Sequence, residues 1–222
     1  MTPFCWDSCK LAIFDLDGVI VDTAKYHYLA WKELADALGF TFTPRHNEGL
    51  KGVSRQRSLE ILLEVGGLTH AFSPGEKEKM AAEKNARYVA YINNLQQDEI
   101  LPGSRALLTG LRAQGIKTAL GSASKNARPI LDKLDITPLF DIIIDGTSTQ
   151  KAKPDPEVFL LAARALSIAP ENCVVFEDAQ VGIDAALAAG MRPIAVGYPG
   201  ILTGADLYIT DLAQVQCPSR LG

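Results

Sequence analysis

The chain has 222 residues, 47% of them apolar and 22% charged, a composition that predicts a packed globular core and argues against disorder. The formal net charge is −4 with both signs interspersed, which argues against a nucleic-acid partner because phosphate-backbone binding usually needs a basic face. No apolar run approaches the roughly 20 residues that span a bilayer, and the first residues lack the basic start and apolar stretch of a secretory signal. We therefore expect a cytoplasmic protein that binds neither membranes nor nucleic acid.

The four cysteines are predicted to be reduced and structurally incidental. Cys5 and Cys9 are separated by three residues, but no histidine lies near them and no second ligand pair follows at short spacing, so a zinc site is not indicated. A chain of this length needs no disulfides to hold its core. Trp6 is predicted either to dock on the core or to belong to a contact.

The first predicted strand is the apolar run "LAIFDLD" (11–17), which ends in Asp15 and Asp17, with Asp22 five residues further on. Three carboxylates so close together repel one another, so something must offset the repulsion. Asp22 with Thr23 is predicted to cap the helix that follows.

Residues 23–94 contain no convincing strand and are predicted to be helical. A crossover of this length is too long for a simple loop, which indicates a small helical domain inserted after the first strand. The predicted boundaries are therefore 1–22 with 95–222 for the main domain and 23–94 for the insertion. The last helix opens with "SPGE", in which Ser73 and Glu76 can form a capping box. The predicted helices are 24–38, 54–65 and 74–95, with a looser piece near 44–50.

After the insertion, strands and helices alternate. Short apolar runs with little polar alternation are typical of a parallel sheet that is covered on both faces. Strands that alternate with helices predict a doubly wound α/β fold. The predicted strands are 117–123, 141–145, 172–178 and 192–197, and the predicted helices are 103–115, 154–167 and 179–190.

Polar residues follow several of these strands, at the sheet edge where open α/β folds bind ligands. A lone Asp-x-Asp is more often a turn or a cap, and Glu177-Asp178 alone could be a helix start, but all of them in order along one sheet indicate a site. Grouped carboxylates suit one Mg²⁺ ion per chain, while a lysine and a hydroxyl suit phosphate oxygens. The pattern thus predicts phosphoryl transfer at a site built from Asp15, Asp17, Ser122, Lys153, Glu177 and Asp178.

Four motifs in this order, "DLDGVIVDT", "SAS", "KPDP" and "EDAQVGI", resemble the haloacid dehalogenase superfamily of phosphotransferases over nearly the whole chain. The resemblance implies a Rossmann-like doubly wound parallel sheet with an inserted helical cap domain. Segments 22–35, 47–59, 83–89 and 122–126 resemble the branch that interconverts β-glucose 1-phosphate and glucose 6-phosphate through β-glucose 1,6-bisphosphate.

By this resemblance Asp15 is the nucleophile that becomes phosphorylated, and Asp17 is the general acid and base for the sugar hydroxyl. Mg²⁺ would be held by Asp15, the backbone carbonyl of Asp17 and Asp178, with Glu177 close by as a further metal residue. The division is physically sensible, because Asp15 must stay ionised to attack while Asp17 must carry a proton at one stage.

A mutase must hold two phosphates, whereas a phosphatase holds one and lets water finish the reaction. Arg55 is the best candidate for a bidentate clamp on the distal phosphate, although Lys51 and Lys125 are equally compatible with solvated surface lysines. The residues predicted to bind phosphate are Lys51, Gly52, Val53, Ser54 and Arg55 in the insertion and Ser122, Ala123, Ser124, Lys125, Asn126 and Lys153 in the main domain.

Two polar residues lie in apolar stripes of the insertion. His27 shares a helix face with Trp31, which we assign to the insertion's core, and Lys84 shares one with Tyr88. A histidine in such a stripe is usually a satisfied core residue, whereas a buried lysine requires an explanation. The resemblance implies that both bind substrate and couple cap closure to the alignment of Asp17.

Two other functions stay open. A sugar-phosphate phosphatase would keep Asp15 and Asp17 but would not need Arg55 or Lys84, and a catalytically silent Mg²⁺- or phosphate-binding protein would not need the intact aspartates. The expected partners are small-molecule sugar phosphates. We expect a monomer, because no long exposed apolar stripe is evident.

Overall fold

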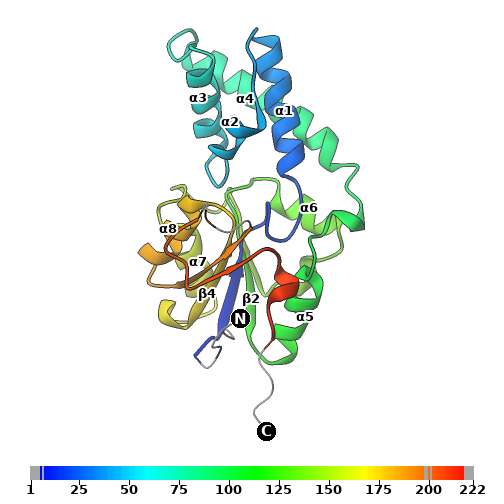
Figure 1. Ribbon diagram of the computed structural model, residues 1–222, viewed down its shortest axis with the longest axis vertical. Helices are drawn as coiled ribbons and strands as arrows, with labels where there is room; N and C mark the ends of the chain where they lie inside the picture. Colours follow the sequence, from blue (N-terminus) through cyan, green and yellow to red (C-terminus); the bar gives the residue numbers. More distant parts are fainter. Residues whose placement is uncertain (1–5, 7, 198–199, 201, 218–222) are drawn as a thin grey trace.

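The computed structural model describes residues 6, 8–197, 200 and 202–217. Their strands form one six-stranded, all-parallel sheet in the order β3-β2-β1-β4-β5-β6, which confirms the predicted α/β class (Figure 1). The strands are β1 (Leu11–Phe14), β2 (Lys117–Gly121), β3 (Ile142–Ile144), β4 (Cys173–Glu177), β5 (Arg192–Val196) and β6 (Leu207–Ile209).

Helices cover both faces of this sheet. Alternate residues of β1 enter different clusters, with Ala12 and Phe14 packing toward α5 and α6 and Leu11 and Ile13 toward α7 and α8. All four β1 side chains are fully buried, which explains why the strand reads as a continuous apolar run. These helices are α5 (Ser104–Ala113), α6 (Ala127–Lys133), α7 (Glu157–Ala165) and α8 (Gln180–Ala188), and the short 3-10 helices are η1 (Gln97–Glu99), η2 (Thr137–Leu139), η3 (Pro170–Asn172) and η4 (Leu212–Gln214).

Of the five α-helices between β1 and β2, the first four gather at one end of the molecule (Figure 1). We call α1–α4 the helical insert. It has its own apolar cluster, which includes Trp31 as predicted. The capping box predicted at Ser73 and Glu76 is present at the start of α4. The four helices are α1 (Ala24–Ala37), α2 (Pro44–Glu48), α3 (Arg55–Val65) and α4 (Pro74–Ile92).

Two elements were not predicted from the sequence. Helix α6 has seven residues and contains Pro129, which lies in the first turn, where the missing N–H breaks no intrahelical bond. Strand β6 is a three-residue edge strand, too short to show a pattern. Thr23 occupies the N-cap position of α1, as predicted, but it makes no side-chain cap bond, and its hydroxyl instead donates to Asp17.

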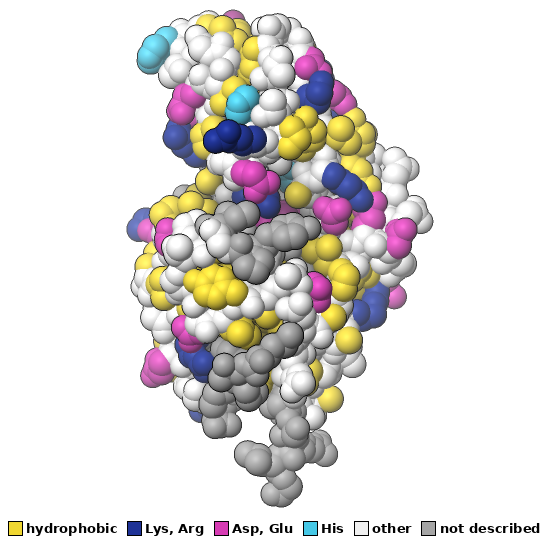
Figure 2. Space-filling view, viewed as in Figure 1, with side chains coloured by type: hydrophobic (Ala, Val, Ile, Leu, Met, Phe, Trp, Pro, Cys, Tyr) yellow, Lys and Arg dark blue, Asp and Glu magenta, His cyan; other side chains and the backbone are white. Residues whose placement is uncertain are grey.

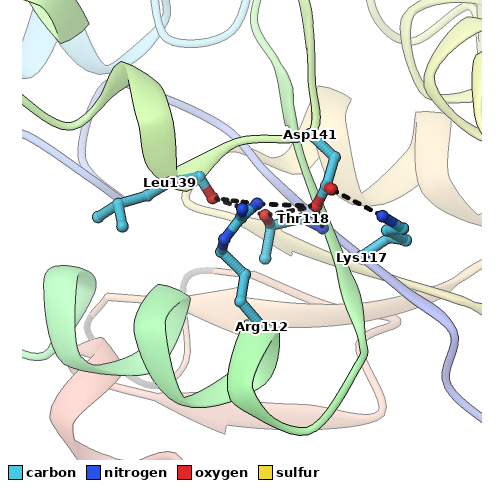
Figure 3. Close-up of polar contacts among 5 residues, drawn as sticks. All are labelled: Arg112, Lys117, Thr118, Leu139 and Asp141. Atoms are coloured by element: carbon cyan, nitrogen blue, oxygen red, sulfur yellow. Dashed lines mark hydrogen bonds and ion pairs between the residues drawn. The ribbon is translucent and has the colours of Figure 1, made fainter.

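At the opposite end of the sheet from the insert, Asp141 joins β2 to its neighbours (Figure 3). Its carboxylate accepts hydrogen bonds from the Thr118 backbone N–H at 2.9 Å, Arg112 at 3.0 Å and Lys117 at 2.9 Å. The Thr118 hydroxyl also donates to the Leu139 carbonyl, at 2.6 Å. These bonds pin the start of β2 without involving the residues predicted for catalysis.

Trp6 docks on the core, one of the two outcomes predicted for it. It is 8% exposed, lies 6.5 Å from the Phe176 ring between centroids, and its indole N–H donates to the Gln216 carbonyl at 2.9 Å. Cys9, Cys173 and Cys217 are free thiols, as expected, and Cys5 lies outside the described residues. None of the helices in the described part of the chain is long and apolar enough to cross a bilayer.

Candidate active site

A pocket of about 260 Å³ lies between the carboxyl ends of the strands and the helical insert. Figure 2 shows acidic and basic side chains close together at the level where the two parts meet. Every residue predicted for the site lines this pocket except Glu177: Asp15, Asp17, His27, Lys51, Gly52, Val53, Ser54, Arg55, Lys84, Ser122, Ala123, Ser124, Lys125, Asn126, Lys153 and Asp178.

The floor of the pocket holds a buried ion-pair cluster centred on Lys153. Its ammonium group donates to Asp15 Oδ1 at 2.6 Å and to Glu177 Oε1, and the three residues are 4%, 6% and 0% exposed. Burial by itself lowers the pKa of Lys153, but the two carboxylates outweigh it and raise the pKa above its ordinary value. The lysine therefore stays charged and holds Asp15 at the carboxyl end of β1.

Glu177, predicted as a further metal residue close to the ion, does not line the pocket. Both of its carboxylate oxygens are engaged, one by Lys153 and the other by the backbone N–H of Ala179 at 2.9 Å. The sequence placed it correctly at the end of β4, but its side chain turns into the protein and away from the cavity. It pairs with Lys153, which it shares with Asp15, but it does not line the pocket.

Asp17 is half-buried and lies two residues after Asp15. Its Oδ1 accepts a hydrogen bond from the buried hydroxyl of Thr23. Burial, followed by the charge of Asp15, raises the pKa of Asp17 from 3.8 to about 7, against the opposing effect of Lys84 and Lys153. Near neutral pH this carboxyl group exists in both protonation states, as a general acid and base requires.

Asp178 approaches the backbone after Asp17 because residue 18 is glycine. Gly18 has a φ of +78°, and a Cβ built on it would lie 2.3 Å from Asp178 Oδ2. Burial, Glu177 and Asp15 raise the pKa of Asp178 well above its ordinary value. The nearest cation to its carboxylate is Lys51 of the insert, at 3.5 Å.

Asp15, Asp17 and Asp178 are the acidic side chains of the pocket that could hold a metal ion. In the described ranges no three acidic, histidine or cysteine side chains form a preassembled metal site. Mg²⁺ usually takes only one or two carboxylates and keeps waters or substrate phosphate as its other ligands. Burial raises the pKa of Asp178 most, and the carboxylates of Glu177 and Asp15 raise it further, an accumulation of negative charge that a cation would offset. The residues therefore fit Mg²⁺ bound by two carboxylates.

The loop between β2 and α6 is held by its own side chains. Ser122 is 1% exposed, and its Oγ accepts a hydrogen bond from the Ser124 backbone N–H at 3.1 Å. The Ser124 Oγ in turn accepts from the Asn126 N–H at 3.2 Å. Lys125 is exposed beside them. This ladder fixes the loop at the edge of the pocket.

The insert contributes a second polar cluster. Lys84 is 3% exposed, its Nζ lies 2.9 Å from His27 Nδ1, and it sits over the rings of Trp31 at 4.3 Å and Tyr88 at 5.1 Å. Burial and the charge of Arg55 lower the pKa of Lys84 from 10.5 to about 7. Burial, Lys84 and Arg55 lower the pKa of His27 well below 6.5, so the imidazole is neutral and accepts from the ammonium group.

Arg55 is half-buried at the start of α3 and lines the pocket. Among the described residues it makes no hydrogen bond or ion pair, in contrast to Arg57, which pairs with Glu60 and Glu64. A half-buried, unpaired guanidinium beside Lys84 indicates a place for an anion.

Sequence reasoning missed three residues of the site. Thr23 was assigned to a cap, although its hydroxyl bonds to Asp17. Asn85 follows Lys84 on α4, lines the pocket and accepts a hydrogen bond from Asn126. Asn47 is 8% exposed and also lines the pocket, within a segment that the sequence had already singled out. Thr23 and Asn85 also lie in segments that carry the family resemblance, 22–35 and 83–89, but no local pattern showed which side chains they contact.

Known proteins resemble this chain over most of its length. The family model described as "Hydrolase: haloacid dehalogenase-like hydrolase" matches residues 9–190. A Bacillus subtilis protein named beta-phosphoglucomutase is 44% identical over 206 residues, 93% of this chain and 91% of that protein. A crystal structure of beta-phosphoglucomutase from Clostridium difficile matches with a TM-score of 0.90 at 44% identity and covers 94% of this chain and 93% of that one.

A relative with a different name is less similar. A Thermotoga maritima protein named phosphorylated carbohydrates phosphatase is 32% identical over 187 residues, 83% of each chain. Both names describe proteins that act on phosphorylated molecules, so the arrangement of the pocket must separate the two activities.

Proposed function

The chain belongs to the haloacid dehalogenase-like hydrolase family, and from this premise we propose that it interconverts β-glucose 1-phosphate and glucose 6-phosphate through β-glucose 1,6-bisphosphate. One observation carries the choice of a mutase: the pocket has two separate cationic groups. Lys153 lies at the sheet edge beside Asp15, while Arg55 and Lys84 lie on the insert. A bisphosphate needs both groups, whereas a phosphatase needs only the first.

In the proposed reaction, Asp15 carries the phosphoryl group and Asp17 moves the proton. The C6 hydroxyl of β-glucose 1-phosphate attacks phosphorus, the bond between phosphorus and the Asp15 oxygen breaks, and Asp17 takes the hydroxyl proton. The bisphosphate then turns around. Asp15 attacks the C1 phosphate, the bond between phosphorus and O1 breaks, and Asp17 returns its proton to O1, which releases glucose 6-phosphate. The pKa of Asp17, about 7, suits both directions of this proton transfer.

We assign Asp15, Asp178 and the backbone carbonyl of Asp17 to Mg²⁺. When bound, the ion supplies electrostatic stabilisation of the charge that develops on the transferring phosphoryl group. The chain's own residues do the rest. Lys153 orients Asp15 through the 2.6 Å bond, and Ser122 with the backbone of Ala123 binds the transferring phosphate.

On the insert, Arg55 clamps the distal phosphate, and Lys84 with His27 places the sugar against Asp17. The proposed remaining binding residues are Lys51, Gly52, Val53, Ser54, Ser124, Lys125 and Asn126. We further propose that residues 23–94 act as a cap domain on the core formed by 1–22 and 95–222, and that the enzyme works as a cytoplasmic monomer on sugar phosphates.

A sugar-phosphate phosphatase is the second candidate, and the Thermotoga maritima relative favours it. One incubation separates the two. The protein is mixed with MgCl₂, β-glucose 1-phosphate and a trace of β-glucose 1,6-bisphosphate, and glucose 6-phosphate and free phosphate are measured together. We expect glucose 6-phosphate without stoichiometric free phosphate, and no product from the Asp15→Asn variant. Free phosphate as the main product would establish the phosphatase instead.

A further inference from the structure

The helical insert meets the rest of the described chain through polar side-chain contacts in three places. At the two connecting segments, Lys25 and Tyr26 of α1 reach Glu99. At one side of the pocket Lys51 pairs with Asp178. At another, the Asn126 Nδ2 donates to Asn85 Oδ1 at 3.0 Å. The last two contacts both lie at the pocket itself.

The contact at Asp178 is tight and leaves the insert little freedom there. Gly52 has a φ of +72°, and a Cβ built on it would lie 2.7 Å from a Val181 methyl group and 3.1 Å from the Ala179 Cβ. The insert thus touches the start of α8 through backbone. The Asn85 contact lies away from this point, on a different helix of the insert, and ends on the loop that precedes α6.

The Asn85 bond completes the hydrogen-bond ladder of the 122–126 loop. Without it, the ladder runs from Ser122 through Ser124 to the Asn126 backbone, and no other described residue holds the Asn126 carboxamide. Asn85 Oδ1 accepts one of the two N–H groups of that carboxamide, which fixes its donor end and leaves the second N–H available. Donor groups are what a phosphate requires.

We propose that Asn85 is a positioning residue that acts through Asn126: when the insert lies over the sheet, it orients the Asn126 carboxamide for a substrate phosphate. This inference rests on the proposed function. It also gives the insert a second role, since α4 carries Lys84, which interacts electrostatically with Asp17, and Asn85, which bonds to the 122–126 loop. The position of α4 thereby affects the residues proposed to bind the sugar and those proposed to bind its phosphate.

A double-mutant cycle in the full-length protein tests the proposal with Asn85→Ala, Asn126→Ala and the double variant. Losing one neutral hydrogen bond should raise the KM for β-glucose 1-phosphate about 3- to 10-fold in Asn85→Ala, with kcat changed less than about twofold. In the Asn126→Ala background the same change should have less than about a twofold effect. Alanine is a better helix former than asparagine, so the variant keeps α4, and Glu83→Ala is the matched control on the exposed face.

Two results would overturn the proposal: an unchanged KM in Asn85→Ala, or the same increase in both backgrounds, which would mean that Asn85 contacts the sugar directly. The same cycle is run on binding of inorganic phosphate by calorimetry. If the wild type produces no glucose 6-phosphate, the proposed function fails, while coupling of the two asparagines in phosphate binding still supports the positioning role. A cycle that shows no coupling between the two asparagines in either measurement overturns the proposal.

Discussion

Two buried lysines line the same pocket from different parts of the molecule, and their surroundings shift their pKa values in opposite directions. Lys153, at the sheet edge, is 4% exposed, and Asp15 and Glu177 raise its pKa against the effect of burial. Lys84, on α4 of the insert, is 3% exposed, and burial together with Arg55 lowers its pKa to about 7. The residue type and burial are alike, so the difference comes from the neighbouring charges.

The comparison shows which part of the site is complete without substrate. At the sheet edge, the Lys153 ammonium group is paired with both Asp15 and Glu177. On the insert, Arg55 and Lys84 are two cations whose effects on each other are unfavourable, and the nearest opposing charge is Asp17. An anionic group bound at the insert would relieve this. Under the proposed function, the distal phosphate of the substrate is that anionic group.

The largest expected effect comes from Lys153→Met, which removes the lysine at the sheet edge. Asp15 and Glu177 would then be buried without a cation, which should cost about 3–5 kcal/mol of unfolding free energy and lower turnover at least about 10³-fold. Burial already raises the pKa of Glu177, and loss of Lys153 removes the charge that opposes this rise, so the destabilisation should be greatest at high pH and should shrink as pH falls and Glu177 binds a proton.

Urea unfolding between pH 5 and 8, together with the mutase assay, checks this prediction. Lys151→Met is the matched control, because that lysine lies two residues earlier, its side chain is 70% exposed and its ion pair with Asp155 is at the surface. Its loss should cost less than about 1 kcal/mol. Equal destabilisation of the two variants would contradict the view that Lys153 balances the sheet edge.

The second prediction concerns the incomplete side and uses Arg55→Ala. Losing a bidentate clamp on the distal phosphate should lower kcat/KM for β-glucose 1-phosphate about 10²- to 10³-fold, while Asp15 still accepts a phosphoryl group from a small donor such as acetyl phosphate. Arg57→Ala, two residues along α3 and paired with Glu60 and Glu64, is the control and should keep wild-type kinetics. Unchanged mutase kinetics in Arg55→Ala would refute the clamp.

The sequence could predict the sheet edge because parallel pairing leaves no choice about where strand ends meet. Asp15, Ser122 and Asp178 were placed from strand ends alone, and all three line one pocket. The capping box at Ser73 was equally local, since its partners are three residues apart. Such features depend on spacing along the chain, which a sequence displays directly.

Side-chain direction and contacts across the pocket could not be read from spacing. Glu177 was placed at the right strand end, yet its side chain turns to Lys153, because a buried carboxylate needs a cation and a backbone donor. Threonine is a residue type that favours helix N-caps, but the Thr23 side chain is fully buried and its hydroxyl bonds to Asp17. Asn85 meets Asn126 across 41 positions of sequence, which depends on how the insert sits over the sheet.

The third prediction concerns the free-energy cost of burying Lys84, which a neutral side chain should remove. The pKa of Lys84 is about 7 in the folded chain against an ordinary 10.5, so between these values the unfolded chain binds a proton that the folded chain has released. The cost of burying Lys84 is thus fully present below about pH 7 and fades as pH rises toward 10.5. Lys84→Met should raise the unfolding free energy by on the order of 2 kcal/mol at pH 7, while mutase activity falls.

Urea unfolding at pH 6, 7.5 and 9.5 measures this gain, which should decrease steadily across the series. Lys79→Met, on the exposed face of the same helix, should show neither the gain nor its pH dependence. If Lys84→Met were less stable than the wild type throughout, the contacts of the ammonium group with Trp31 and Tyr88 would outweigh its desolvation. Lys84 would then be stabilised by its surroundings without substrate, as Lys153 is at the sheet edge.

The smallest expected effect separates catalysis from the stability of the sheet. Asp141 holds the start of β2, at the end of the strand away from the pocket (Figure 3), and the Thr118 N–H, Lys117 and Arg112 lower its pKa against the effect of burial. A lowered folded pKa gives stability that is present above about pH 4 and is lost as pH falls through the folded value. Asp141→Asn should therefore cost about 1–2 kcal/mol at pH 7, because its cationic partners are partly exposed, and less at pH 3. Its mutase KM and kcat at 25 °C should equal those of the wild type; a changed KM would mean that the opposite end of β2 communicates with the phosphate loop.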